Sequence, residues 1–202
     1  HNRRSDLPNQ ADRMEYINKM RKSYPFHPEL IDMFRLKWGQ DSRFQRTRGV
    51  LRLLASIVKD LWTRRGSLTG TQALIHTSDV NLSNLPTLTG TITSLMGSQW
   101  ETVIHADVIG TSSNAYKIDN EDPNNNIGKY NLTQGIATTI LMASLGNLQN
   151  KGLTIEELKL CILKPSAFNH SEVNSALNKL EQVAHYLYST NVGSRSYWFQ
   201  SK

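Results

Sequence analysis

The last third of the chain, residues 130 to 202, carries the pattern that most constrains the fold. Thr154 with Glu157, and Asn169 with Glu172, each form a capping box, in which two side chains bond each other's backbone N–H groups at a helix start. Two β-prone runs follow, "HYLYS" and "SYWFQ", and the turn-forming segment "TNVGSR" separates them. This order predicts two capped helices followed by a β-hairpin.

A further helix is predicted ahead of the two capped ones, starting at Asn131 or Thr133. Its apolar positions are Ile136, Ile140, Leu141 and Leu145. Three helices followed by a hairpin is the order of a winged helix-turn-helix. Residues 130 to 202 are therefore predicted to be a winged-helix-like domain, with Cys161 as a small core residue.

Residues 1 to 66 are predicted to form a compact helical unit. One helix covers residues 9 to 22, and Pro28 suits the first position of a second. The third helix begins between Arg43 and Thr47, and its apolar stripe consists of Val50, Leu54, Ile57, Val58 and Leu61, with Leu53 beside it.

Residues 67 to 129 are less regular and are predicted to be a mixed connector. The segment "TQALIHTSDVNL" suggests a short strand, and two short helices are expected within residues 88 to 96 and 100 to 108. The turn-rich run "NEDPNNNIG", residues 120 to 128, is the best candidate for a domain boundary. The fold class predicted for the whole chain is mainly α with a small β component, α+β.

The charge is unevenly distributed, with 15 Lys/Arg and 7 Asp/Glu in residues 1 to 66, against 8 and 10 in the remainder. An anionic partner is thus expected to meet the first third, and a solvated basic surface is the alternative. No apolar run approaches the roughly 20 residues of a membrane span. No secretory signal occurs, and the single cysteine suits a reduced, cytoplasmic setting.

The motifs of several enzyme classes are missing. Gly128-Lys129 is followed by Tyr130 and lacks the upstream glycine of a Walker A loop, and no GxGxxG, GxSxG or HExxH pattern occurs. The six histidines are scattered without metal-ligand spacing. We therefore expect no catalytic residue and no metal site within these 202 residues.

Arginines crowd the predicted start of the third helix, in "SRFQRTRGVLRLLA". Arg43, Arg46 and Arg48 lie where the helix dipole is already positive, and each costs a few tenths of a kcal/mol unless an anion is near. A phosphate would use both the arginines and the unpaired N–H groups. In the alternative interpretation these arginines pair with nearby carboxylates, namely Asp41, Asp32 or Glu29.

The segment from Tyr24 to Trp62 resembles a large bacterial and archaeal family of predicted AAA-type ATPases, long labelled a domain of unknown function. Members are often encoded beside adenine-specific DNA methylases in modification and phage-defence loci. The most specific pieces are "YPFHPEL" and "FQRTRGVLRLLA", and "WETVIHADVIG" and "ATTILMASLGN" also look like the family. The resemblance is weakest over residues 67 to 99.

The resemblance implies that the chain is the C-terminal part of such an ATPase, with the Walker motifs in an upstream core. Residues 1 to 66 would be the helical lid, and Arg46 and Arg48 would be similar to sensor-2 arginines, which reach the γ-phosphate in cis or across a homo-oligomer. ATP and Mg²⁺ would serve the full-length protein, whereas the fragment alone would be non-catalytic.

Two rival interpretations remain open, a nucleic-acid-binding winged helix and a passive protein-interaction scaffold. The third helix of the predicted winged helix has one permanent cation, Lys179, and the wing adds Arg195. Glu172 and Glu181 oppose them, so DNA contact through this surface is possible but not favoured. The aromatic residues of the hairpin are expected to pack on its helices or on a protein neighbour.

Overall fold

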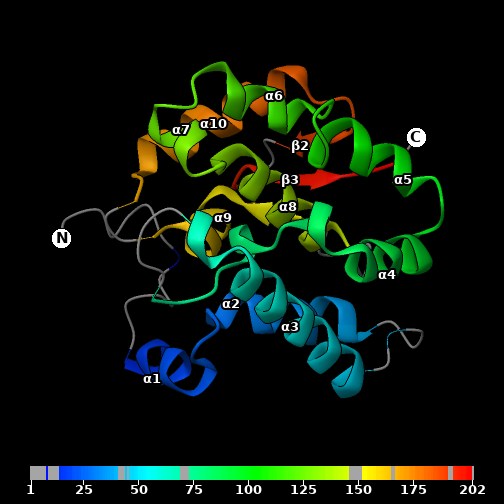
Figure 1. Cartoon of the computed structure of the whole chain (residues 1–202), viewed down its shortest axis with the longest axis vertical. Helices are drawn as coiled ribbons and strands as arrows, with labels where there is room; N and C mark the ends of the chain where they lie inside the picture. Colours follow the sequence, from blue (N-terminus) through cyan, green and yellow to red (C-terminus); the bar gives the residue numbers. More distant parts are fainter. Residues whose placement is uncertain are drawn as a thin grey trace.

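The structure is a computed structural model that describes residues 14–40, 46–68, 73–145, 152–164, 167–190 and 193–201, together with Pro8 and Phe44. It is mainly helical, with a small three-stranded antiparallel sheet (Figure 1), which confirms the predicted α+β composition. No helix within these ranges is both long and apolar enough to cross a membrane.

The first third forms a layer of helices along one side of the molecule. Its elements are α1 (Met14–Ser23), α2 (Pro28–Asp32), the π-helical η3 (Met33–Lys37), η4 (Trp38–Gln40) and α3 (Arg46–Thr63). Pro28 occupies the first turn of α2, and α3 starts inside the predicted interval. The predicted apolar stripe of α3 is wrong at Val58, whose side chain is exposed, whereas Leu53 is buried.

The middle of the chain is more helical than predicted. Its elements are η5 (Arg65–Ser67), η6 (Thr77–Asp79), η7 (Leu82–Asn84), α4 (Pro86–Met96), α5 (Trp100–Val103), η8 (Ile104–Val108), α6 (Asn114–Glu121) and α7 (Asn126–Lys129). The two short helices expected there are present as α4 and as α5 with η8. The suggested strand is reduced to one parallel bridge between Phe26 and Ile75 in the described residues.

Helix α6 was not predicted, although the sequence holds its start signal. The Ser113 hydroxyl accepts the N–H of Tyr116, which caps the helix, and Ala115 and Ile118 are buried. The predicted loop of residues 120 to 128 is consequently shorter than expected, since α6 and α7 enter it from either side. Packing against α8 stabilises α6 and α7 as helices, although the turn-rich composition of this segment predicts a loop.

The last third contains α8 (Leu132–Ser144), β1 (Leu153–Thr154), α9 (Ile155–Ile162), α10 (His170–Val183), β2 (Leu187–Thr190) and β3 (Ser196–Phe199). Both predicted capping boxes are confirmed at α9 and α10. The hairpin is confirmed as well, with Leu187 opposite Phe199 and Thr190 opposite Ser196. Strand β1 adds a third strand, giving the sheet order β1-β3-β2.

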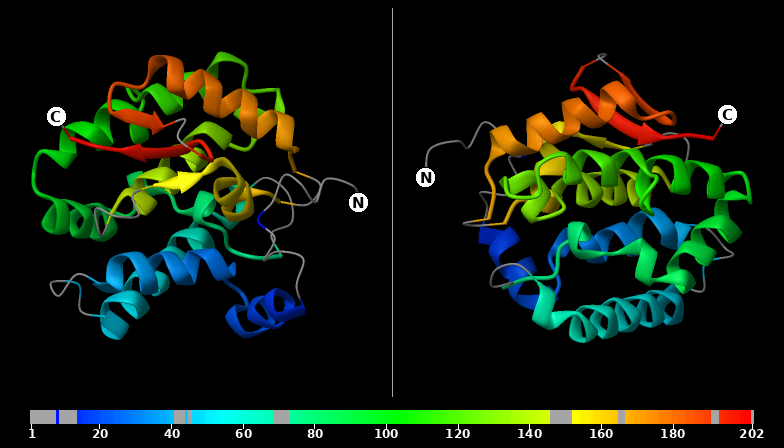
Figure 2. Two further views of the ribbon diagram at one scale, coloured as in Figure 1. Left: turned by 180° about the vertical axis from the view of Figure 1, so that it is seen from behind. Right: turned by 45° about the horizontal axis from the view of Figure 1, so that its top comes forward.

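Helix α8 is the centre of the core, and every residue in it except Gln134 is buried. Helices α6, α7 and α10 pack on one side of α8, and the layer of α1 to α3 lies on the other (Figure 2). Buried apolar residues form one continuous cluster from Leu30 to Phe199, and Cys161 is part of it, as predicted. The divisions at residues 66 and 129 stay predictions, and side-chain packing runs across both.

Candidate functional site

The start of α3 and the length of α4 border an open groove with a volume of about 890 Å³. Arg48 and Arg52 lie one helical turn apart on the α3 side. The α4 side presents hydroxyl groups at helical spacing, from Thr87, Thr91 and Ser94. The groove therefore combines two exposed cations with hydroxyl side chains, of which that of Thr91 donates to the backbone oxygen of Thr87 at 2.8 Å; the cations suit an oxyanion such as phosphate.

Both groove arginines are exposed, and no carboxylate pairs with either one within the described part of the chain. Of the carboxylates in the alternative, Glu29 and Asp32 both pair with Lys19, and neither pairs with Arg48 among the described residues; the alternative stays untested for Arg43 and Arg46. Asp41 and Arg43 lie outside the described residues, as does the side chain of Arg46. Of Arg46 the structure gives only its backbone position, as the first residue of α3.

Aromatic side chains of the core pack against the N-terminal turn of α3. The ring of Phe44 meets that of Trp38 edge-on, with centroids 5.7 Å apart. A Cβ at Gly49 would lie 3.3 Å from the Phe44 ring, so glycine lets the ring pack closely beneath this turn. The arginine-bearing turn is therefore seated on the buried core.

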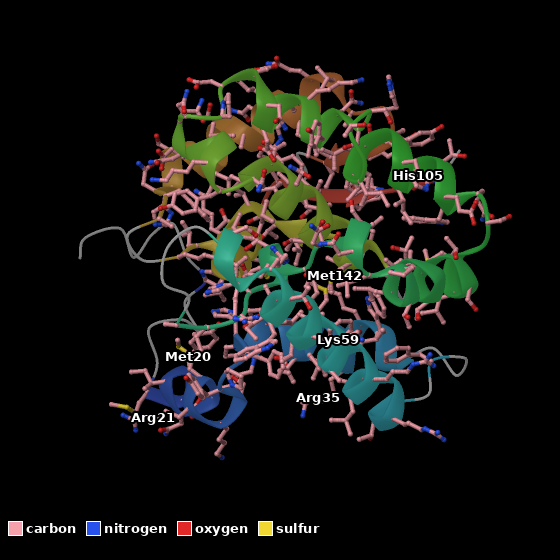
Figure 3. The ribbon with its side chains drawn as sticks, viewed as in Figure 1. Met20, Arg21, Arg35, Lys59, His105 and Met142 are labelled. Carbon is pink, nitrogen blue, oxygen red and sulfur yellow. The ribbon has the colours of Figure 1, made fainter. Side chains whose placement is uncertain are left out.

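The outward face of α3 is apolar as well as basic. Leu51, Val58 and Trp62 are 61%, 41% and 69% exposed, at the i, i+7 and i+11 spacing that places them along one stripe. Cations border this stripe, at Arg48, Arg52, Lys59 and Arg65. Lys59 is labelled in Figure 3, on the same helical layer as Arg21 and Arg35. An exposed stripe of this kind marks a contact surface.

The acidic residue nearest the end of this face is already engaged. Asp60 accepts a hydrogen bond from Arg64 Nε at 2.7 Å and from the Asn84 amide at 3.0 Å. The Arg65 guanidinium lies 4.7 Å from the centre of the Trp62 ring, a cation–π contact. The α3 face thus has a positive border, and Asp60, the acidic residue at its end, is already paired with Arg64.

A second polar cluster is buried between α2, η6 and α9. The rings of His27 and His76 stack with centroids 4.5 Å apart, and His76 Nδ1 lies 3.1 Å from the carbonyl oxygen of Cys161. Burial lowers the pKa of His27 to about 3, with a further lowering from His76 and Lys19. Burial also lowers the pKa of His76. Both rings are therefore neutral at pH 7 and act as packing and hydrogen-bonding groups.

The two cations predicted as possible nucleic-acid contacts are each paired within the chain. Lys179 Nζ donates to Glu121 at 2.7 Å, and Arg195 Nη2 donates to both oxygens of Glu181 at 2.6 and 2.7 Å. These pairs reduce the positive potential that the surface could offer to phosphates. The hairpin's Tyr197 and Phe199 are buried against the helices, as expected, and Tyr188 stacks with Trp198 on the other face.

The sequence pointed to Arg48 but not to the α4 side of the groove. The Thr87-Thr91-Ser94 spacing could have indicated a hydroxyl-bearing helix face, yet only the packing of α4 places it opposite α3. Across the described ranges, no group of three His, Cys, Asp or Glu side chains is arranged to hold a metal ion.

The family comparison matches nearly the whole chain. A family model described as "DUF499 second domain" covers residues 9–199, so the chain belongs to this family. The predicted membership of a family labelled a domain of unknown function is thereby confirmed. Searches of curated proteins and of solved structures found no match.

Proposed function

We propose that this chain is the lid and winged-helix portion of a cytoplasmic AAA-type ATPase linked to DNA modification or phage defence. The observation that carries the proposal is the pair of exposed arginines, Arg48 and Arg52, at the head of a long helix and beside an open hydroxyl-lined groove. This arrangement suits a phosphate brought by another part of the protein.

In such an assembly, ATP with Mg²⁺ would be bound by Walker residues of the upstream core. The guanidinium of Arg48, with Arg46 beside it at the helix start, would stabilise negative charge on the transferring phosphoryl group. Because α3 is a rigid helix seated on the core, the position of the lid would follow the presence of the γ-phosphate. The residues present fit a phosphate contact, whereas magnesium ligands would come from the core.

The exposed apolar stripe of α3 is a second observation that supports a lid role. A lid must contact its ATPase core, and Leu51, Val58 and Trp62 offer the apolar surface for such a contact. The border of cations around them favours an acidic partner surface. A neighbouring subunit of a homo-oligomer could present the same surface.

The winged-helix assignment is supported by the order of elements. A helix, a short strand, two capped helices and a hairpin follow one another from α8 to β3, and β3 lies between β1 and β2. The internal pairing of Lys179 and Arg195 favours a protein-packing role for this domain over DNA contact.

The test is ATP hydrolysis by the full-length protein. Arg48→Ala should lower turnover by more than about tenfold, because the positive charge is lost where the phosphoryl group develops negative charge. Arg46→Ala and Arg52→Ala test the two neighbouring arginines in the same assay, and Lys117→Ala, at an exposed lysine of α6 outside the groove and the α3 face, is the control. Unchanged hydrolysis and ATP affinity in Arg48→Ala and Arg46→Ala would show that the sensor assignment is wrong.

The alternative function is nucleic-acid binding through the basic α3 face. It predicts binding that falls steeply with added salt and that Lys59→Ala weakens together with Arg48→Ala. A passive scaffold predicts no response to nucleotide or DNA.

A further inference from the structure

A second cavity, distinct from the α3–α4 groove, lies where the three predicted parts of the chain meet. Its volume is about 310 Å³. Arg64 comes from the end of the α3 segment, Ser78 from η6, Lys129 from α7, Gln134 from α8, and Lys164 follows α9. A site built from so many separate segments exists only in the folded chain.

The charge of this cavity is positive. Three of its lining side chains are cations, Arg64, Lys129 and Lys164, and one is a carboxylate, Asp79. Lys164 forms an ion pair with Asp79, whose other carboxylate oxygen accepts the backbone N–H of His76 at 2.8 Å. Asp79 is thus bonded through both oxygens, and Arg64 is paired with Asp60 from outside the lining, so the lining side chains themselves hold three cations and one carboxylate.

The cations are also held in place. Arg64 Nη2 donates to the backbone oxygen of Asp79 at 2.6 Å, while its Nε bonds to Asp60. Lys164 is tied to the same residue, Asp79, through its side chain. Two cations from distant parts of the chain are therefore fixed around η6 before any ligand arrives, which lowers the entropy lost on binding.

The wall beside these cations carries an unsatisfied hydroxyl. Ser78 lines the cavity, and its Oγ is buried without a hydrogen-bond partner among the described residues. Gly135 allows α8 to approach at this point, because a Cβ there would lie 2.8 Å from the Ser78 Cβ. Buried hydroxyls are nearly always hydrogen-bonded in native proteins, so the Ser78 hydroxyl offers a hydrogen bond to a molecule in the cavity.

We propose that this cavity binds a small phosphate monoester, with the phosphoryl group near Arg64, Ser78 and Lys164. The rest of the lining is mixed: it includes Tyr116, Tyr130 and Asn131 beside aliphatic side chains such as Leu82 and Ile109, which suits an organic group with both ring and polar atoms attached to the phosphate. The cavity adjoins the C-terminal end of α3, whereas Arg48 is near its start. A ligand here would hold that end of α3 against α8, and so would act on the lid at a distance from the groove.

The experiment is calorimetric titration of the 202-residue chain with inorganic phosphate, AMP and adenosine, at a constant ionic strength. We expect saturable binding of AMP, weaker binding of phosphate, and none of adenosine. Tighter binding of phosphate than of AMP would assign the site to free phosphate and would overturn the monoester proposal. The absence of saturable binding by either anion up to about 10 mM would overturn the site itself.

Variants of the lining residues test whether AMP binds in this cavity. Ser78→Ala should weaken AMP binding by about fivefold or more through the loss of a hydrogen bond to the phosphoryl group, and Lys129→Gln should do the same because it removes one of the three cations of the lining. Lys117→Gln, an exposed lysine of α6 that does not line the cavity, should leave the affinity unchanged. If Lys129→Gln and Ser78→Ala bind AMP as the parent does, the proposal fails.

A double variant of the groove arginines distinguishes AMP binding in the second cavity from the proposed phosphate contact in the α3–α4 groove. Arg48→Ala with Arg52→Ala should leave AMP binding by the isolated chain intact, even though the same changes are expected to reduce hydrolysis in the full-length protein. Loss of AMP binding in that double variant would place the phosphate in the α3–α4 groove and refute the second site.

Discussion

The indole Nε1 of Trp38 donates a hydrogen bond to the backbone oxygen of Met142 at 3.0 Å, joining residues 104 positions apart in the sequence. Beside it, Lys37 Nζ donates to the backbone oxygen of Gly152 at 2.8 Å. Met142 lies in α8, and Figure 3 labels it at the junction with the helical layer of the first third. The first contact attaches the arginine-bearing layer to the central helix of the core, and the second attaches it to the residue that precedes β1.

Trp38→Phe should destabilise the whole chain in a single unfolding transition. It removes the hydrogen bond and part of the buried ring, an expected loss of about 1–3 kcal/mol in the free energy of unfolding. Urea denaturation followed by circular dichroism measures it, with the exposed Trp62→Phe as the matched control, expected within about 0.5 kcal/mol of the parent. Two separate transitions, with Trp38→Phe shifting only one, would show instead that residues 1 to 66 unfold independently.

The stacked histidines predict a pH dependence of stability. The folded-state pKa of His27 is lowered to about 3, so the unfolded chain binds the proton more readily. Its contribution is fully present above the unfolded pKa near 6.5 and is lost as the pH falls toward 3. Between pH 7 and pH 5 the loss should be roughly 1–2 kcal/mol.

The change His27→Phe keeps a ring in the stack and removes the titrating group. We expect the variant to lose less stability than the parent between pH 7 and pH 5, whatever its absolute stability. Comparing the two pH dependences cancels the carboxyl groups common to both chains, Glu29 and Asp119, whose pKa values burial raises. Equal pH dependence in the two chains would show that His27 does not remain neutral in the fold.

The isolated chain should neither hydrolyse ATP nor bind it tightly. It has no P-loop to hold the β- and γ-phosphates, and Arg48 with Arg52 would supply only an open, solvated contact. Calorimetric titration with MgATP should give an affinity weaker than about 1 μM. A submicromolar dissociation constant would contradict the assignment of the chain to a fragment without its own nucleotide core.

DNA binding, if any, should not depend on the predicted winged helix. Lys179→Glu and Arg195→Glu should leave the affinity of the chain for duplex DNA at low salt unchanged, because both cations are already paired with carboxylates. Arg52→Glu with Lys59→Glu on α3 is the comparison that should weaken any basal binding. Micromolar or tighter binding that is abolished by both winged-helix reversals would show that this surface does contact DNA.

The sequence by itself determined the elements whose signals lie within one turn of chain. The capping boxes at Thr154 and Asn169 placed the starts of α9 and α10, and two β-prone runs on either side of a turn-forming segment placed the hairpin. A helix cap forms hydrogen bonds with residues two or three positions away. The start of the helix can therefore be predicted from the local sequence alone.

Only the tertiary structure decided which surfaces are buried and which charges meet. Val58 belongs by spacing to the apolar stripe of α3, yet packing buries Leu53 and leaves Val58 exposed. The pairings of Arg195 with Glu181 and of Lys164 with Asp79 depend on segments brought together by folding. Burial and ion pairing depend on which residues are close in space. Those contacts form only when the helices pack around α8, so local sequence patterns cannot predict them.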